Sequence, residues 1–319
     1  MKILITGCCG FIGYHLTTKL LNKYNVIGLD NLSNYYSKRY KLRRLKELKK
    51  IKKFKFIKLD LSNKHKLNQI FKKKKFDIVI NLAAQPGVRL SISNPEKYYK
   101  NNILSFYNLI ECIKQKKIRH FIFASSSSVY GNQIKYPVNE NADISKPLSF
   151  YGASKVCNEA MAYSFSNMYK IPTTCLRFFT VYGPENRPDM ALYKFTKKIL
   201  ADEKIELYNN GNYQRDFTYI SDIIDSISRL LNKPPKNDIP YHVFNIGRSK
   251  PQKVKKFINS IINQLNSKYK KQKNLKRDNN NEPLITYSNS KKLAKYINFS
   301  PKIDLEKGIF KFIKWYKNK

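Results

Sequence analysis

The sequence is short of acidic residues, of metal-ligand motifs and of long apolar runs. No segment reaches the roughly 18 unbroken apolar residues that a membrane-spanning helix needs. Among 319 residues there are five cysteines and four histidines, but no Cys-x-x-Cys occurs and the histidines are scattered, so a zinc site is disfavoured. The first residues do not form a complete export signal, and we therefore expect reduced thiols and a cytoplasmic location.

The scarcity of acidic residues leaves a large positive charge. There are 22 Asp and Glu against 62 Lys and Arg, for a formal net charge of +40. A charge of this size raises a nucleic-acid hypothesis. However, the 51 lysines are spread along the chain, and the densest run, Lys38 to Lys58, is predicted mostly as a solvated helical face. We therefore predict no specific nucleic-acid partner and no membrane partner.

Short apolar strands alternate with helical stretches in the first half of the chain. Strands are expected at 3–5, 26–29, 54–59, 76–82, 121–123 and 173–178, and helices at 11–22, about 95–114 and about 152–169. Strands that alternate with helices and are apolar on both faces predict an α/β fold with a Rossmann-type doubly wound parallel sheet. After about residue 180 prolines interrupt the pattern, which predicts a smaller C-terminal lobe.

A glycine-rich turn follows the first predicted strand. Residues 6–13 read Thr-Gly-Cys-Cys-Gly-Phe-Ile-Gly and open the first helix. Glycines there let the backbone approach a pyrophosphate, and the helix N-terminus offers free N–H groups. Asp30 closes the second strand, where a carboxylate accepts hydrogen bonds from the adenosine ribose and favours NAD over NADP. Asp60 ends the third strand and is placed to meet the adenine, so the sequence predicts bound NAD.

A candidate general base follows the fifth strand. Tyr151 and Lys155 are four residues apart and share one face of a helix. A free tyrosine has a pKa of about 10, and a nearby cation stabilises its phenolate. The pair is therefore a plausible base for a sugar hydroxyl. Residues Ser125–Ser128 lie at the end of the fifth strand, where a hydroxyl can relay the proton, and the four serines leave the choice open.

With these motifs, the chain resembles the extended short-chain dehydrogenase/reductase family of nucleotide-sugar enzymes nearly from end to end. Within it, the segments 30–36, 83–89, 176–184, 187–191 and 215–219 are most similar to those of UDP-glucuronate 4-epimerases. The resemblance implies catalytic roles for Tyr151, Lys155, Ser126 and Ser127. It implies a cofactor site formed by Gly7, Gly10, Phe11, Ile12, Gly13, Asp30, Asn31, Asp60, Leu61, Leu82, Ala83, Ala84, Asn101, Tyr151 and Lys155. It implies substrate contacts from Arg89, Ser126, Ser127, Thr180, Arg187 and Arg215.

The implied activity is inversion at C4 of UDP-glucuronate through a 4-keto intermediate with bound NAD, giving UDP-galacturonate. Related decarboxylases and 4,6-dehydratases typically carry an acid where Ser128 stands, and UDP-galactose 4-epimerases typically carry Asn at the position of Thr180. The alternatives are another nucleotide-sugar 4-epimerase, such as the UDP-glucose/UDP-galactose type, and a non-catalytic basic binding module. The intact Tyr151–Lys155 pair disfavours the second.

The resemblance also implies an organisation. Residues 1–180 are expected to form the NAD-binding Rossmann domain, and 181–319 mainly a lobe for the nucleotide sugar, with about 215–247 returning to the first domain. Relatives commonly dimerise through the helices at 95–114 and 152–169, which implies a homodimer. The segment 277–286 departs from the family's proline-glycine-aspartate turn, and no role is assigned to it.

Overall fold

The structure of the chain, a computed structural model, describes residues 1–269, 271–275 and 283–319. The chain divides into two compact units. The first comprises Met1–Gly131, Asp143–Arg177 and Ile224–Phe244, and the second comprises Asn132–Ala142, Phe178–Ile223 and Asn245–Lys319. The short segment Asn132–Ala142 therefore belongs to the second unit, which the sequence did not indicate. Most of the departing segment, Arg277 to Glu282, lies outside the described residues.

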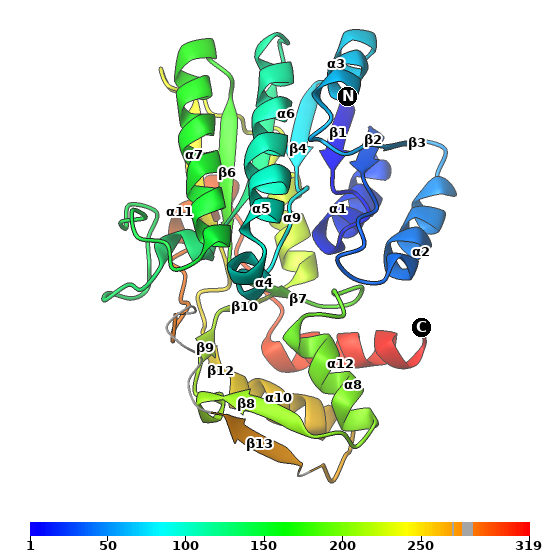
Figure 1. The fold of residues 1–319 in the computed structure, drawn as a ribbon, viewed down its shortest axis with the longest axis vertical. Coiled ribbons are helices and arrows are strands. Elements are labelled where there is room, and N and C mark those ends of the chain that lie inside the picture. The colour runs from blue at the N-terminus through cyan, green and yellow to red at the C-terminus, as the bar shows by residue number, and fades with distance from the viewer. Residues whose placement is uncertain (270, 276–282) are drawn as a thin grey trace. The chain divides into compact units, whose positions relative to one another are not determined.

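A seven-stranded sheet with the strand order β11-β6-β5-β4-β1-β2-β3 forms the first unit (Figure 1). In the part of the sheet from β3 through β2, β1 and β4 to β5, each strand pairs in parallel with the next. The strands are β1 (Lys2–Thr6), β2 (Asn25–Asp30), β3 (Phe54–Lys58), β4 (Ile78–Asn81), β5 (His120–Ser126), β6 (Thr173–Phe178) and β11 (Tyr241–Ile246). The strand order reverses between β1 and β4, as in a doubly wound fold, so the predicted fold class is confirmed.

Helices connect these strands. They are α1 (Phe11–Leu21), α2 (Lys38–Lys49), α3 (Lys64–Lys73), α4 (Val88–Ser93), α5 (Pro95–Tyr98), α6 (Ser105–Lys114), α7 (Phe150–Tyr169) and α9 (Ile220–Leu230), with a π-helical segment at Tyr99–Leu104 and a 3₁₀ turn at Ser127–Tyr130. The helix predicted at about 95–114 is thus continuous but changes its winding. Helices α3, α6 and α7 pack beside one another, and Figure 1 shows α6 and α7 side by side. Lys19 of α1 pairs with Asp225 of α9 at 3.3 Å.

Aromatic and aliphatic side chains of β5 and α6 fill the core of this unit. Phe121 and Phe123 lie stacked, with ring centroids 5.6 Å apart, and Phe106 of α6 packs edge-on against Phe123 at 5.1 Å. All three side chains are buried, as are Leu109 and Ile113 one and two turns further along α6. Burial of this apolar layer holds β5 in the middle of the sheet, so that the serines at its end stand on a rigid support.

In the part of the second unit that the structure describes, short two-stranded sheets pack with helices. Its strands form three pairs, β7 with β10, β9 with β12 and β8 with β13. The elements are β7 (Thr180–Tyr182), α8 (Ala191–Leu200), β8 (Ile205–Tyr208), β9 (Gln214–Arg215), β10 (Phe217–Tyr219), β12 (Gln252–Lys253), α10 (Val254–Gln264), β13 (Gln272–Leu275), α11 (Lys291–Ile297) and α12 (Leu305–Lys317), with a 3₁₀ turn at Asn209–Gly211. Among the described residues, no helix is both long enough and apolar enough to cross a membrane.

Candidate active site

At its glycine positions, the turn between β1 and α1 is packed too closely for a side chain to be added without a shift of the backbone. Gly7 has φ +71°, and a Cβ atom there would lie 2.8 Å from the backbone nitrogen of Ala83. A Cβ atom on Gly13 would lie 2.0 Å from the carbonyl oxygen of Gly7, and one on Gly10 would lie 3.1 Å from that same oxygen. Helix α1 has no acidic residue in its first turn and no side-chain cap. The turn therefore fits a dinucleotide pyrophosphate.

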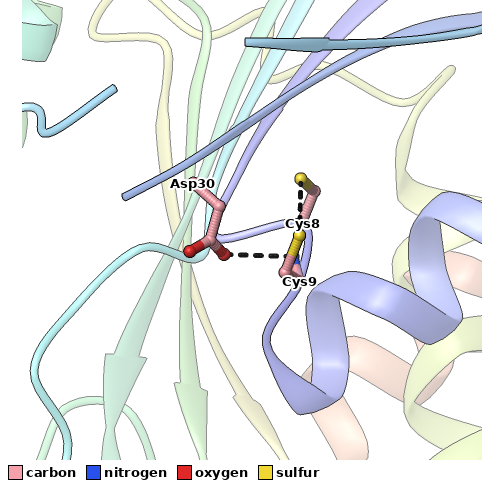
Figure 2. Close-up of side chains that lie close together, drawn as sticks. All are labelled: Cys8, Cys9 and Asp30. Carbon is pink, nitrogen blue, oxygen red and sulfur yellow. Dashed lines mark hydrogen bonds between the residues drawn. The ribbon is translucent and has the colours of Figure 1, made fainter. Parts of the chain in front are cut away.

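Asp30 lies beside this turn, at the end of β2 (Figure 2). Its carboxylate accepts hydrogen bonds from the backbone N–H of Cys9 at 3.0 Å and of Leu32 at 2.8 Å. These two bonds leave further lone pairs on the carboxylate for ribose hydroxyls. The buried ammonium of Lys41 lies 3.9 Å from the same carboxylate. The placement of Asp30 thus fits the NAD role that the sequence predicts.

Cys8 and Cys9 face Asp30, with 3.8 Å between the two sulfur atoms (Figure 2). Both side chains are fully buried. The hydrogen bond to Cys9 and burial together hold the pKa of Cys8 well above its usual value, so the thiol stays protonated. Zinc binds thiolates, and the arrangement therefore favours small neutral residues packed under the turn over a metal site.

A cavity of about 860 Å³ opens where β2 and β3 end, and Asn31, Asp60 and Asn101 contribute to its lining. Burial raises the pKa of Asp60, but hydrogen bonds from the Asn31 side chain (2.9 Å) and from the Ser62 N–H (2.9 Å) outweigh it and lower the pKa overall. Asp60 is therefore ionised at neutral pH and held in place. The Asn101 amide donates to the Lys97 carbonyl at 2.7 Å.

The remaining predicted cofactor residues are distributed around the same turn. Phe11, Gly13 and Leu61 are buried, whereas Ile12, Leu82, Ala83 and Ala84 are partly exposed. The Thr6 hydroxyl accepts a hydrogen bond from the Ala83 N–H at 3.2 Å and donates to the Asn81 side chain at 2.5 Å, which ties the end of β4 to the end of β1.

Most basic residues of the run Lys38 to Lys58 are exposed, as predicted, but Lys41 and Arg44 are exceptions. Arg44 of α2 is 1% exposed and Lys41 is 7% exposed, so this face of the helix is not solvated. Arg44 donates to the Cys9 carbonyl at 3.0 Å and to the Tyr36 hydroxyl at 3.0 Å, bracing the glycine-rich turn. The helical spacing of the sequence could have predicted this burial, because Lys41 and Arg44 share a helix face with the apolar residues Leu45 and Leu48.

Tyr151 and Lys155 occupy the first turns of α7. Ser149 caps this helix by accepting a hydrogen bond from the Gly152 N–H at 3.1 Å. The Lys155 ammonium lies 6.0 Å from the centroid of the Tyr151 ring and donates to the Ala124 carbonyl at 2.9 Å. Lys155 is 3% exposed, and burial lowers its pKa to about 8. Tyr151 itself is partly exposed, as a base that meets a substrate must be.

The serines at the end of β5 differ in their partners. Ser125 is turned inward and donates to the Glu159 carboxylate at 2.5 Å. The Ser126 hydroxyl donates to that of Ser128 at 3.2 Å and accepts from the Ser128 N–H at 3.2 Å. Ser127 begins the 3₁₀ turn and is partly exposed. Ser126 and Ser127 therefore stay the relay candidates.

Sequence reasoning missed Glu159 and the partner role of Arg177. Their side chains form a buried ion pair with 2.7 Å between Nη2 and Oε2, and the Arg177 Nε donates to both carboxylate oxygens at 3.0 and 3.2 Å. Glu159 lies four residues after Lys155 on α7, which is the only sequence signal for it. The contact with Arg177 joins α7 to β6 and has no local pattern.

The predicted substrate residues are divided between the two units. Arg89 is exposed on α4 of the first unit. In the second unit, Thr180 begins β7, and Arg187 forms a two-pronged pair with Asp189 at 3.1 and 3.0 Å. Arg215, on β9, donates to the carbonyl oxygens of Gln214 at 2.9 Å and of Pro283 at 3.0 Å.

A known protein family matches most of the chain. Residues 3–247 match the model of the NAD dependent epimerase/dehydratase family. The chain belongs to this family. Among curated members, it is 44% identical to Protein CapI of Staphylococcus aureus, with 99% of this chain and 98% of that protein covered. It is 34% identical to a probable UDP-glucuronate 4-epimerase of Rhizobium meliloti, with 99% and 97% covered.

A solved structure extends the comparison with this epimerase/dehydratase family. The UDP-glucuronic acid 4-epimerase of Bacillus cereus, in complex with UDP-glucuronic acid and NAD, superposes with a TM-score of 0.93 at 33% identity. The match covers 100% of this chain and 99% of that chain. The family prediction from the sequence is therefore confirmed, together with dependence on NAD.

Proposed function

We propose that this chain is a UDP-glucuronate 4-epimerase, which converts UDP-glucuronate to UDP-galacturonate with bound NAD. The observation that carries the proposal is the placement of Tyr151 and the buried Lys155 on one helix face, beside the serines that end β5. The likeness to the B. cereus enzyme, which binds UDP-glucuronic acid and NAD, supports the substrate.

The turn at Gly7–Gly13 would hold the pyrophosphate of NAD, with Asp30 on the adenosine ribose and Asp60 towards the adenine. Bound NAD supplies a reversible hydride acceptor at C4 of the sugar. In the forward step Tyr151 would remove the proton of the C4 hydroxyl, and a serine hydroxyl, of Ser126 or Ser127, would relay that proton. The protonated Lys155 favours the phenolate of Tyr151 that this step needs.

After the sugar turns over, Tyr151 would give its proton back to the oxygen at C4, and the bound cofactor would supply the hydride for the opposite face. The reaction has no net redox change, so the cofactor need not leave between turnovers. The 4-keto sugar is a β-keto acid, which loses CO₂ easily. We assign Thr180, Arg89 and Arg187 to the sugar and its carboxylate, and Arg215 to the diphosphate, because an arginine fork suits both anions.

The two units are expected to bind different molecules. We propose that the first unit, with the seven-stranded sheet, binds NAD and that the second binds the nucleotide sugar. We also propose a homodimer through the helices at 95–114 and 152–169, where Tyr99, Tyr107 and Tyr163 are 52%, 37% and 48% exposed. Five free cysteines support a reducing, cytoplasmic location.

Incubation with UDP-glucuronate followed by NMR of the products tests the proposal. The wild-type chain is expected to give UDP-galacturonate, and Tyr151→Phe is expected to keep NAD while turnover falls about 10²- to 10⁴-fold. Tyr24→Phe is the matched control and keeps its rate, because Tyr24 is partly exposed and precedes β2, at the end of the strand opposite to Asp30. A pentose product or no product refutes the epimerase, and epimerisation of UDP-glucose alone establishes the runner-up. Near-normal rates for Tyr151→Phe refute the base assignment.

A further inference from the structure

Three side chains lie in a row on α7. Tyr151, Lys155 and Glu159 are spaced by four residues and share one face of the helix. The first two form the proposed base. Glu159 is 5% exposed and Arg177, its partner from β6, is 4% exposed. A buried ion pair is weak evidence for stability, because desolvation offsets the attraction, so its presence next to the base calls for another reason.

The ion pair forms hydrogen bonds with both ends of the segment Ser125–Tyr130, which we call the serine segment. The Glu159 carboxylate accepts a hydrogen bond from the Ser125 hydroxyl at 2.5 Å, where β5 ends. Arg177 donates from Nη1 to the Tyr130 hydroxyl at 3.0 Å, and its guanidinium carbon lies 4.9 Å from the centroid of the Tyr130 ring. Residues 126–129 therefore lie between two residues that the ion pair holds in place, Ser125 and Tyr130. Lys155 adds a third by donating to the Ala124 carbonyl just before the segment.

We propose that Glu159 and Arg177 are positioning residues, which hold the serine segment at its place beside Tyr151 and keep Lys155 in its charged state. This inference rests on the proposed function, because it concerns the base and relay assigned there. The groups that face Lys155 are Tyr151 and Glu159 of α7, Cys175 of β6 and the Ala124 carbonyl of β5. Of these, Glu159 carries the negative charge.

The two proposed roles can be measured separately, the charge effect by the pH profile of kcat/KM and the positioning effect by kcat. Burial lowers the pKa of Lys155, and the interactions with Cys175 and Glu159 oppose that effect. Glu159→Gln keeps the size of the side chain but removes its charge, so Lys155 loses its proton at lower pH and the alkaline limb of kcat/KM moves to lower pH. Loosening of the serine segment is expected to lower kcat about tenfold or more, with KM unchanged.

The experiment compares wild type with Glu159→Gln, with Arg177→Lys and with the double variant Glu159→Gln/Arg177→Met. The double variant removes both charges of the ion pair, so neither is left buried without its partner, and it keeps the test valid if Glu159→Gln fails to fold. Thr174→Val is the matched control, because it removes a buried 2.8 Å hydrogen bond to His120 at the opposite end of β5. Arg177→Lys keeps the charge but loses the fork, so kcat falls and the alkaline limb stays.

The outcomes separate the two hypotheses. The positioning role is supported if the wild type forms product and kcat falls in all three variants of the ion pair. It also requires that the alkaline limb of kcat/KM moves in Glu159→Gln and that Thr174→Val keeps the wild-type kcat. A folded double variant with wild-type kcat, or a Glu159→Gln limb that does not move, overturns it. A wild-type chain that forms no UDP-galacturonate, with NAD bound, overturns the proposed function instead.

Discussion

Replacement of Lys155 by methionine is predicted to make the chain more stable while it abolishes turnover. The ammonium is 3% exposed, and burial lowers its pKa from 10.5 to about 8. The folded protein therefore holds this charge in surroundings that disfavour it. Methionine has a similar length and carries no charge, so it removes the unfavourable burial and, with it, the cation beside Tyr151.

The size of the effect follows from the pKa. One pKa unit corresponds to about 1.4 kcal/mol, so burying the charged form costs about 3 kcal/mol. The variant also loses the hydrogen bond from Lys155 to the Ala124 carbonyl, which contributes about 1 kcal/mol. The net gain in the free energy of unfolding is therefore about 2 kcal/mol at pH 7.

The pH dependence gives the sharper test. Below pH 8 both the folded and the unfolded chain carry the proton, and the cost is fully present. Between pH 8 and 10.5 only the unfolded chain binds it, so the free energy of unfolding of the wild type rises with pH. The variant has no such proton, and its advantage over the wild type shrinks across this range.

Urea unfolding of wild type and Lys155→Met at pH 7 and pH 10 measures the difference. Both chains contain the same 23 tyrosines, whose titration cancels in the comparison. A variant that is less stable than wild type at pH 7, or an advantage that does not change with pH, refutes the reasoning that burial of the charge dominates at this position.

Two further predictions concern the cofactor turn and the substrate carboxylate. Gly13→Ala places a Cβ atom 2.0 Å from the Gly7 oxygen, and the resulting overpacking costs about 1–3 kcal/mol. NAD binding measured by calorimetry is therefore expected to weaken at least about tenfold. Gly10→Ala, whose Cβ atom would lie 3.1 Å from the same oxygen, is expected to weaken binding less. Equal NAD affinities for the two variants contradict the steric argument. Arg187→Ala is expected to raise the KM for UDP-glucuronate more than that for UDP-glucose, measured by steady-state kinetics, and Asp189→Asn, which frees the same fork, is expected to lower it. Equal effects of Arg187→Ala on both substrates remove the carboxylate assignment.

Local patterns were enough to predict the sheet, the glycine-rich turn and the Tyr151–Lys155 pair. Apolar residues that alternate with polar ones, or repeat every three to four positions, report which face of a segment is buried. A pair four residues apart on a helix meets whatever the rest of the chain does. The position of Asp30 at a strand end is likewise a local property.

Only the tertiary structure decided which serine turns inward, why Arg44 is buried and what Glu159 does. Each answer depends on a contact between elements far apart in the chain, as in the meeting of α7 with β6 or of α2 with the turn after β1. Such contacts form where packing brings two surfaces together, and the composition of either segment alone carries no trace of its partner.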